Sequence, residues 1–82
     1  MRKVEQKMND ESILMALKDM IELNYKVMIS YKHAGGNYVV EVLRDDYYLP
    51  PAYNYFQMEN LDVAIREAGK WVERQVAAEF EK

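Results

Sequence analysis

Apolar residues near the N-terminus recur at the spacing of one helical face. The positions are Ile13, Leu14, Leu17, Met20 and Ile21. Because an α-helix has 3.6 residues per turn, these side chains share one stripe that can be buried. Asn9 or Asp10 can cap the free amide groups at the start, and the acidic side chains of Asp10 and Glu11 suit the positive end of the helix dipole. We expect a helix that starts near Asn9 to Ser12 and stops near Asn24.

The hydrophobic period changes from 3.6 to 2 at Tyr25, which predicts a half-buried strand. Its apolar face carries Tyr25, Val27, Ile29 and Tyr31. Residues 33–37, His-Ala-Gly-Gly-Asn, can turn the chain tightly because glycine adopts positive φ angles without strain. A second, antiparallel strand over residues 38–43 has apolar side chains on both faces. We therefore expect it to be the more central strand.

Residues 44–57 combine turn and strand signals. Asp45-Asp46 indicates a turn, after which either residues 47–49 or residues 53–57 can form a third strand. Pro50 and Pro51 have no backbone amide donor and cannot lie inside a central ladder. We therefore expect an edge strand that is interrupted by a loop.

The last element is a long amphipathic helix with Asn60 as a suitable N-cap. Its apolar stripe consists of Leu61, Ala64, Ile65, Ala68, Val72 and Val76, flanked by Trp71 and Phe80. Gly69 costs about 1 kcal/mol relative to alanine inside a helix, so its presence indicates a close neighbour. We expect that neighbour to be the sheet.

Together these elements predict a single small α+β domain in the order α-β-β-(β)-α. The sheet should be antiparallel and two- or three-stranded, with both helices packed on one face. A chain of 82 residues has room for one core. We expect the domain to comprise residues 9–82 and to follow a flexible N-terminal tail of residues 1–8.

This order of elements resembles the α-β-β-β-α layout of double-stranded-RNA-binding domains. Those domains carry a lysine cluster at the start of the last helix, where this chain has Glu-Asn-Leu-Asp-Val-Ala at residues 59–64. The resemblance therefore implies a layout without RNA binding. Residues 31–42 and 59–68 are also similar in pattern to HicB-type antitoxins, which pair two strands around a glycine turn before an acidic-capped helix. Neither likeness includes a specific motif, and we assign the chain to no family.

Composition and charge narrow the choice of partners and compartment. The formal net charge is −3, which is the wrong sign for gripping phosphates through bulk electrostatics, so direct nucleic-acid binding is not expected. No cysteine is present to form disulfides, and residues 1–7 lack the apolar core of a signal peptide. No run approaches the ~20 apolar residues of a membrane span. We expect a cytoplasmic protein that does not enter the membrane.

The side chains that carry catalytic or metal chemistry are scarce. The chain has one histidine, His33 beside the glycine turn, and its only serines are Ser12 and Ser30. These few residues do not provide a catalytic nucleophile together with a general base that activates it. The histidine is best explained as an exposed turn residue. The spacing of Asp45 and Asp46 fits no known metal loop, and Gly35-Gly36 fits no phosphate loop. We expect a protein that is not an enzyme and has neither cofactor nor metal.

The segment from Arg44 to Phe56 is the best candidate for a contact surface. All seven tyrosines of the chain lie between residues 25 and 55. Those at positions 25, 31 and 38 fit ordinary packing between strands, whereas the later ones flank the prolines. Tyrosine has a large, stiff apolar body with a polar tip, which suits recognition surfaces. The predicted partner-binding residues are Asp45, Asp46, Tyr47, Tyr48, Tyr53 and Tyr55.

The sequence leaves three functions open. The first is a non-catalytic protein–protein interaction module, in its specific form a small acidic inhibitor or adaptor that covers a basic, nucleic-acid-binding surface as phage anti-defence proteins do. The second is a small-molecule binder or minimal enzyme with a Tyr- and Asp-lined pocket at a dimer interface. The third is self-association through a sheet edge or through apolar surface on the last helix, at Val63, Trp71 and Ala78.

Overall fold

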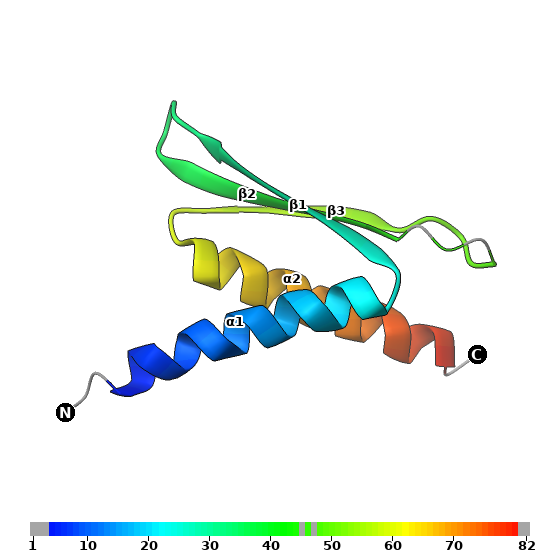
Figure 1. Cartoon of the computed structure of the whole chain (residues 1–82). Helices are drawn as coiled ribbons and strands as arrows, with labels where there is room; N and C mark the ends of the chain where they lie inside the picture. Colours follow the sequence, from blue (N-terminus) through cyan, green and yellow to red (C-terminus); the bar gives the residue numbers. More distant parts are fainter. Residues whose placement is uncertain (1–3, 45, 47, 81–82) are drawn as a thin grey trace.

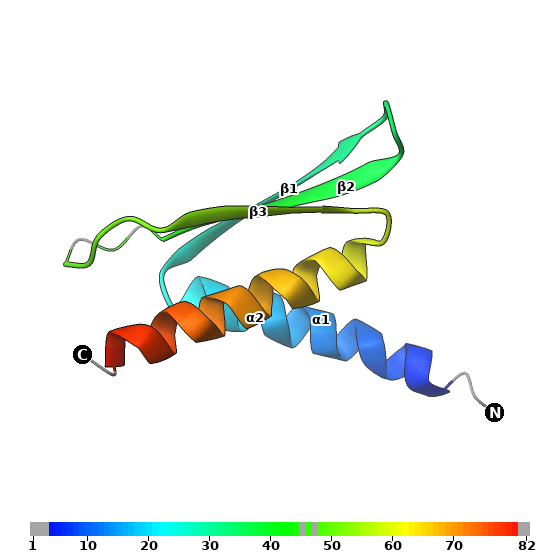
Figure 2. The same cartoon turned by 180° about the vertical axis from the view of Figure 1, so that it is seen from behind.

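The computed structural model describes residues 4–44, 46 and 48–80, with side chains from residue 11 onward. Its elements are α1 (Val4–Glu22), β1 (Tyr25–Lys32), β2 (Asn37–Arg44), β3 (Tyr53–Met58) and α2 (Leu61–Phe80). Both helices lie on the same face of an antiparallel sheet, and the other face is uncovered (Figures 1 and 2). The predicted α+β fold, with its element order and one-sided helix layer, is confirmed.

The sheet has the strand order β1-β2-β3, so β2 is central as expected. The turn between β1 and β2 uses Gly35 and Gly36 at φ angles of 97° and 64°. Toward this turn the hairpin curves away from the helix layer (Figures 1 and 2), which leaves the helix-side residues Ile29 and Tyr31 exposed. Of the two candidate third strands, the later one forms, while Tyr48 and Leu49 belong to the preceding loop.

The boundaries of α1 differ from the expected ones at the start and agree at the end. The helix begins at Val4, so the expected start near Asn9 to Ser12 was too late. The expected flexibility of residues 1–8 stays a prediction. At the other end, Asn24 adopts a left-handed φ of 69°, which ends the helix because asparagine tolerates that conformation better than most residues.

The core lies between the sheet and the two helices. Its buried residues are Met20, Tyr25, Val40, Val42, Ala64, Ile65, Ala68 and Val72. The predicted stripe of α2 is therefore confirmed, with Ala64, Ile65, Ala68 and Val72 buried, whereas its expected flank Phe80 is exposed. The predicted stripe of α1 is only partly correct. Leu14 and Ile21 are exposed, because α1 packs on β1 and α2 alone and these two positions lie at the margin of that contact.

Gly69 faces the other helix rather than the sheet. A Cβ built at this position would lie 3.8 Å from the Cβ of Ala16 in α1, and no sheet atom is nearer. The prediction of a close neighbour is thus confirmed, and the identity of that neighbour is corrected. Small residues on both helices allow α1 and α2 to cross closely.

Gly69→Ala should raise the free energy of unfolding by about 1 kcal/mol, because alanine restricts the unfolded chain and the added methyl meets Ala16 at ordinary contact distance. Urea denaturation measures this difference. Gly36→Ala is the control and should destabilise the protein, since its φ of 64° strains any residue with a Cβ. A loss of stability in Gly69→Ala would show that the helices cannot accommodate a methyl group.

Candidate functional site

The residues predicted to bind a partner are divided between two surfaces. Asp46 and Tyr48 lie in the loop between β2 and β3, at the end of the molecule that holds the C-terminal ends of both helices. Tyr53 and Tyr55 lie on β3 and point to the uncovered face of the sheet. Asp45 and Tyr47 lie outside the described residues. The structure therefore offers two candidate sites in place of one.

The first candidate is a cavity of about 390 Å³, here called the end cavity. It lies between the C-terminal parts of α1 and α2 and the loop that joins β2 to β3, which contributes Asp46 and Leu49. Its described lining residues are Glu22, Leu23, Asn24, Tyr25, Arg44, Asp46, Leu49, Val76, Glu79 and Phe80. This volume is within the range of small-ligand pockets, roughly 300 to 1,000 Å³.

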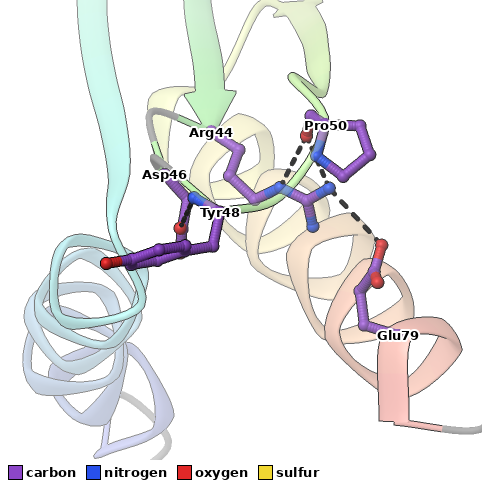
Figure 3. A network of polar contacts seen from close by, with 5 residues as sticks. All are labelled: Arg44, Asp46, Tyr48, Pro50 and Glu79. Carbon is purple, nitrogen blue, oxygen red and sulfur yellow. Dashed lines mark hydrogen bonds and ion pairs between the residues drawn. The ribbon is translucent and has the colours of Figure 1, made fainter.

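Arg44 fixes the loop that walls the end cavity. Its side chain is 6% exposed, and its Nε and Nη2 donate to the carbonyl oxygen of Pro50 at 3.1 and 2.7 Å. The same Nη2 also lies 3.4 Å from Oε2 of Glu79 (Figure 3). The backbone amide of Arg44 donates to the carbonyl of Ala52 at 2.7 Å. One buried guanidinium thus connects β2, the Pro-Pro loop and the end of α2.

Asp46 closes the loop on its other side. Its Oδ1 accepts the backbone N–H of Tyr48 at 2.8 Å, and its Oδ2 lies 3.5 Å from Nδ2 of Asn24. The first contact is the hydrogen bond of an Asx turn, which explains why an aspartate occupies this position. The second joins the loop to the turn between α1 and β1. Tyr48 projects from this loop and is 87% exposed (Figure 3).

Tyr25 lines the end cavity from the core side. The residue is 3% exposed, and its ring meets Trp71 edge-on with the ring centroids 6.2 Å apart. Its hydroxyl group is buried and has no hydrogen-bond partner among the described residues. An unpaired buried hydroxyl lowers stability by about 1 to 3 kcal/mol. Because this oxygen has almost no accessible surface, the cost falls on the stability of the core.

The chemical character of the end cavity is apolar with an acidic margin. Leu23, Leu49, Val76 and Phe80 supply the apolar surface, and three carboxylates stand among them, at Glu22, Asp46 and Glu79. Arg44 is the one cation among the described lining residues, and it is engaged with Pro50 and Glu79. This arrangement suits an apolar group that carries a positive charge beside it.

The second candidate is the uncovered sheet face. A shallow hollow there is lined by Ser30, Lys32, Val39, Glu41, Tyr53, Tyr55 and Gln57. The Tyr53 hydroxyl donates to Oε2 of Glu41 at 2.7 Å, so its polar tip is already satisfied. That hydrogen bond, together with the negative charge of Glu41, raises the pKa of Tyr53 above its usual value. The face is mixed in polarity, as antiparallel sheets that face water commonly are.

No cluster of three or more histidine, cysteine, aspartate or glutamate side chains that could hold a metal ion occurs among the described residues. None of the described helices is long and apolar enough to cross a membrane.

The sequence interpretation assigned no role to Arg44, which holds the wall of the end cavity. Its signal was a charged residue at the inward position of β2 that follows Val40 and Val42.

Arg44→Ala should lower the free energy of unfolding by about 3 kcal/mol, because the loss of a buried charge leaves Glu79 and the Pro50 carbonyl without their donor. Arg44→Lys should recover only part of this loss, since an ammonium group cannot reproduce the two-donor contact. Denaturant unfolding measures both variants. Arg66→Ala is the matched control: it breaks an exposed pair with Asp62, and its effect should stay below about 1 kcal/mol. Equal losses in Arg44→Ala and Arg66→Ala would contradict the structural role of Arg44.

The pKa of Tyr53 should fall toward the ordinary value of about 10 in Glu41→Ala, because both the acceptor and the negative charge are removed. A folded-state pKa above the unfolded one means that this contact stabilises the protein below about pH 10 and that its contribution is lost as pH rises further. NMR titration of the tyrosine ring carbons measures the change. An unchanged Tyr53 pKa in the variant would show that Glu41 is not its cause.

Comparison of the chain with known proteins gave no significant match to a protein-family model, a curated protein or a solved structure. The features that bear on function are therefore the end cavity, the uncovered sheet face and the chemistry of their side chains.

Proposed function

We propose that this protein is a non-catalytic protein–protein interaction module that receives an apolar side chain of a basic partner in the end cavity. The observation that carries the proposal is the combination of a preformed cavity, an exposed apolar rim and an excess of carboxylates in one place. Partner proteins commonly insert one or two large anchor side chains into such cavities, and these anchors supply most of the binding energy.

The rim of the end cavity is more apolar than a solvated surface requires. Phe80 is 85% exposed at the end of α2. Leu23, in the turn after α1, is 43% exposed, and Leu49, in the loop between β2 and β3, is 37% exposed. Their side chains belong to the same cavity lining. Isolated exposed apolar residues are ordinary, but several that surround one cavity are typical of a binding surface.

Charge indicates which kind of partner segment fits. The carboxylates of Glu22, Asp46 and Glu79 outnumber the single guanidinium of Arg44 in the lining. Glu22 also pairs with Lys18 at 3.3 Å, but both side chains are more than half exposed, so this pair is weak. The local field therefore favours lysine or arginine beside the anchor and speeds the encounter with a basic surface. Inhibition of a nucleic-acid-binding protein is the narrower form of this proposal.

The uncovered sheet face supports partner binding less well. The Tyr53 hydroxyl is satisfied by Glu41, and the hollow beside it is shallow and mixed in polarity. Of the predicted binding residues, Asp46 and Tyr48 belong to the proposed site, with Asp46 in the lining and Tyr48 next to it on the loop. Tyr53 and Tyr55 serve as internal controls.

An NMR titration with short synthetic peptides tests the proposal. The peptide Lys-Lys-Phe-Lys-Lys, blocked at both ends, should shift the amide signals of cavity residues such as Leu49 and Val76, with a dissociation constant on the order of 1 mM. Replacing its phenylalanine by alanine, or its lysines by glutamates, should weaken binding about tenfold. The reason is that the first change removes the anchor and the second reverses the charge attraction.

Variants of the protein separate the end cavity from the uncovered face. Phe80→Ala and Asp46→Asn should each weaken binding of the phenylalanine peptide several-fold, and Asp46→Asn retains an oxygen that can accept the Tyr48 amide. Tyr55→Ala removes an exposed aromatic side chain from the other face and should change nothing. Signal shifts centred on Tyr53 and Tyr55, or equal binding of the phenylalanine and alanine peptides, would overturn the proposal.

A further inference from the structure

The outward side of α1 carries a second apolar surface, separate from the end cavity. A hollow of about 360 Å³ lies there among Glu11, Leu14, Met15 and Lys18. Leu14 and Met15 are 66% and 58% exposed, although they stand in a helix whose opposite side packs against the core. We call these four residues the α1 patch. Two large apolar side chains at the centre of an exposed helix face favour coverage by another protein surface.

The position of α1 in the fold explains why this patch is uncovered. α2 packs beneath both β2 and β3, whereas α1 contacts only the edge strand β1 and α2. Toward its N-terminal end α1 slopes away from the sheet (Figures 1 and 2). The radius of gyration is 13.9 Å, above the value of about 12 Å expected for a compact domain of this length. Among the residues that the structure describes, one side of α1 therefore has no packing neighbour.

The charges of the α1 patch on one copy of the chain complement those of the same patch on a second copy. Glu11 and Lys18 are seven residues apart, which places them on the same side of the helix two turns from each other. Leu14 and Met15 lie midway between them. Rotation by 180° about an axis that crosses the helix at this midpoint exchanges the positions of the acid and the base. The same patch on a second copy of the chain is thus its electrostatic complement.

We propose that two copies of this chain form a dimer in which the two α1 helices pack antiparallel through the α1 patch. Glu11 of each copy faces Lys18 of the other, so two ion pairs form. Leu14 meets Leu14 and Met15 meets Met15 next to the symmetry axis. This arrangement buries the apolar centre of the patch between two charged ends, the pattern that fixes orientation and register in helix pairs.

The contact between Lys18 and Glu22 within one chain is compatible with this dimer. The two groups are 3.3 Å apart and more than half exposed. An ammonium group has three donors, so Lys18 can serve Glu22 and the opposite Glu11 together. Glu22 is the one described lining residue of the end cavity that the dimer involves, and it does so only through its ion pair with Lys18. The success or failure of the dimer is therefore independent of the proposed peptide binding.

Charge reversal tests the dimer and its register together. Sedimentation equilibrium should give the native chain a mass of about twice 9.7 kDa at high concentration. Glu11→Lys and Lys18→Glu should each raise the dimer dissociation constant on the order of ten- to hundredfold, because both ion pairs become repulsive. An equimolar mixture of the two variants should restore the dimer mass as a heterodimer. The reason is that one chain then carries a base at both patch positions and the other an acid at both, so each contact again joins opposite charges.

The matched control uses α2, where Arg66 and Glu73 are exposed and also seven residues apart. Arg66→Glu and Glu73→Lys, alone or mixed, should leave the native dissociation constant unchanged, and circular dichroism should show that every variant remains folded. A native chain that stays monomeric overturns the proposal. So does a dimer that ignores the α1 reversals, because it would use another surface such as the β1 edge. Failure of the mixed variants to associate would overturn the antiparallel register.

Discussion

The packing of α2 against the inward-facing valines of β2 is the contact on which the rest of the structure depends. Val40 and Val42 are fully buried, and the α2 residues above them include Ala64 and Ala68, which are equally buried and small. Small side chains on the helix allow it to lie close to the sheet and to cover β2 and β3 together. One helix therefore covers two of the three strands, and α1 is left to cover the remaining edge.

The end cavity follows from how the inward face of β2 continues beyond this contact. After Val40 and Val42, the next inward position is Arg44, whose guanidinium cannot pack as an apolar group and instead holds the Pro50 carbonyl and Glu79. The loop is thus fixed by hydrogen bonds at a distance from the core, and the space between them is not filled by the chain. A charged residue at an inward position therefore leaves a cavity, bounded by the loop, where the core would otherwise continue.

Local sequence patterns predicted most elements of the fold because hydrophobic period and turn chemistry are local properties. They predicted both strands of the hairpin, the position of its turn, the buried stripe of α2 and the one-sided helix layer. They predicted the covered side of α1 through Ile13, Leu17 and Met20 but overstated its width. Leu14 belongs to the same periodic run and is exposed, because periodicity does not say how wide the opposing surface is. The width of that surface depends on the edge position of β1.

The candidate site was predicted only in part for a similar reason. The segment of residues 44–56 contributes Asp46 to the cavity lining, but Tyr53 and Tyr55 point to the other face of the sheet. Their direction is set by strand register, and the path of the loop is set by the contact of Arg44 with Pro50 and Glu79. Glu79 is 35 residues away in sequence from Arg44, beyond the reach of any local pattern.

Tyr25 is part of the hydrophobic core and also lines the end cavity. The molecule measures only 17 Å across its thinnest direction, so it has a single core layer and no inner shell that could separate the two roles. A substitution at this position should alter both folding and the proposed recognition. If the end cavity binds a partner as proposed, Tyr25 has little freedom to change the specificity of binding without also changing the stability of the fold. New specificity would then be more accessible at the rim residues Leu49 and Phe80 than at the cavity wall.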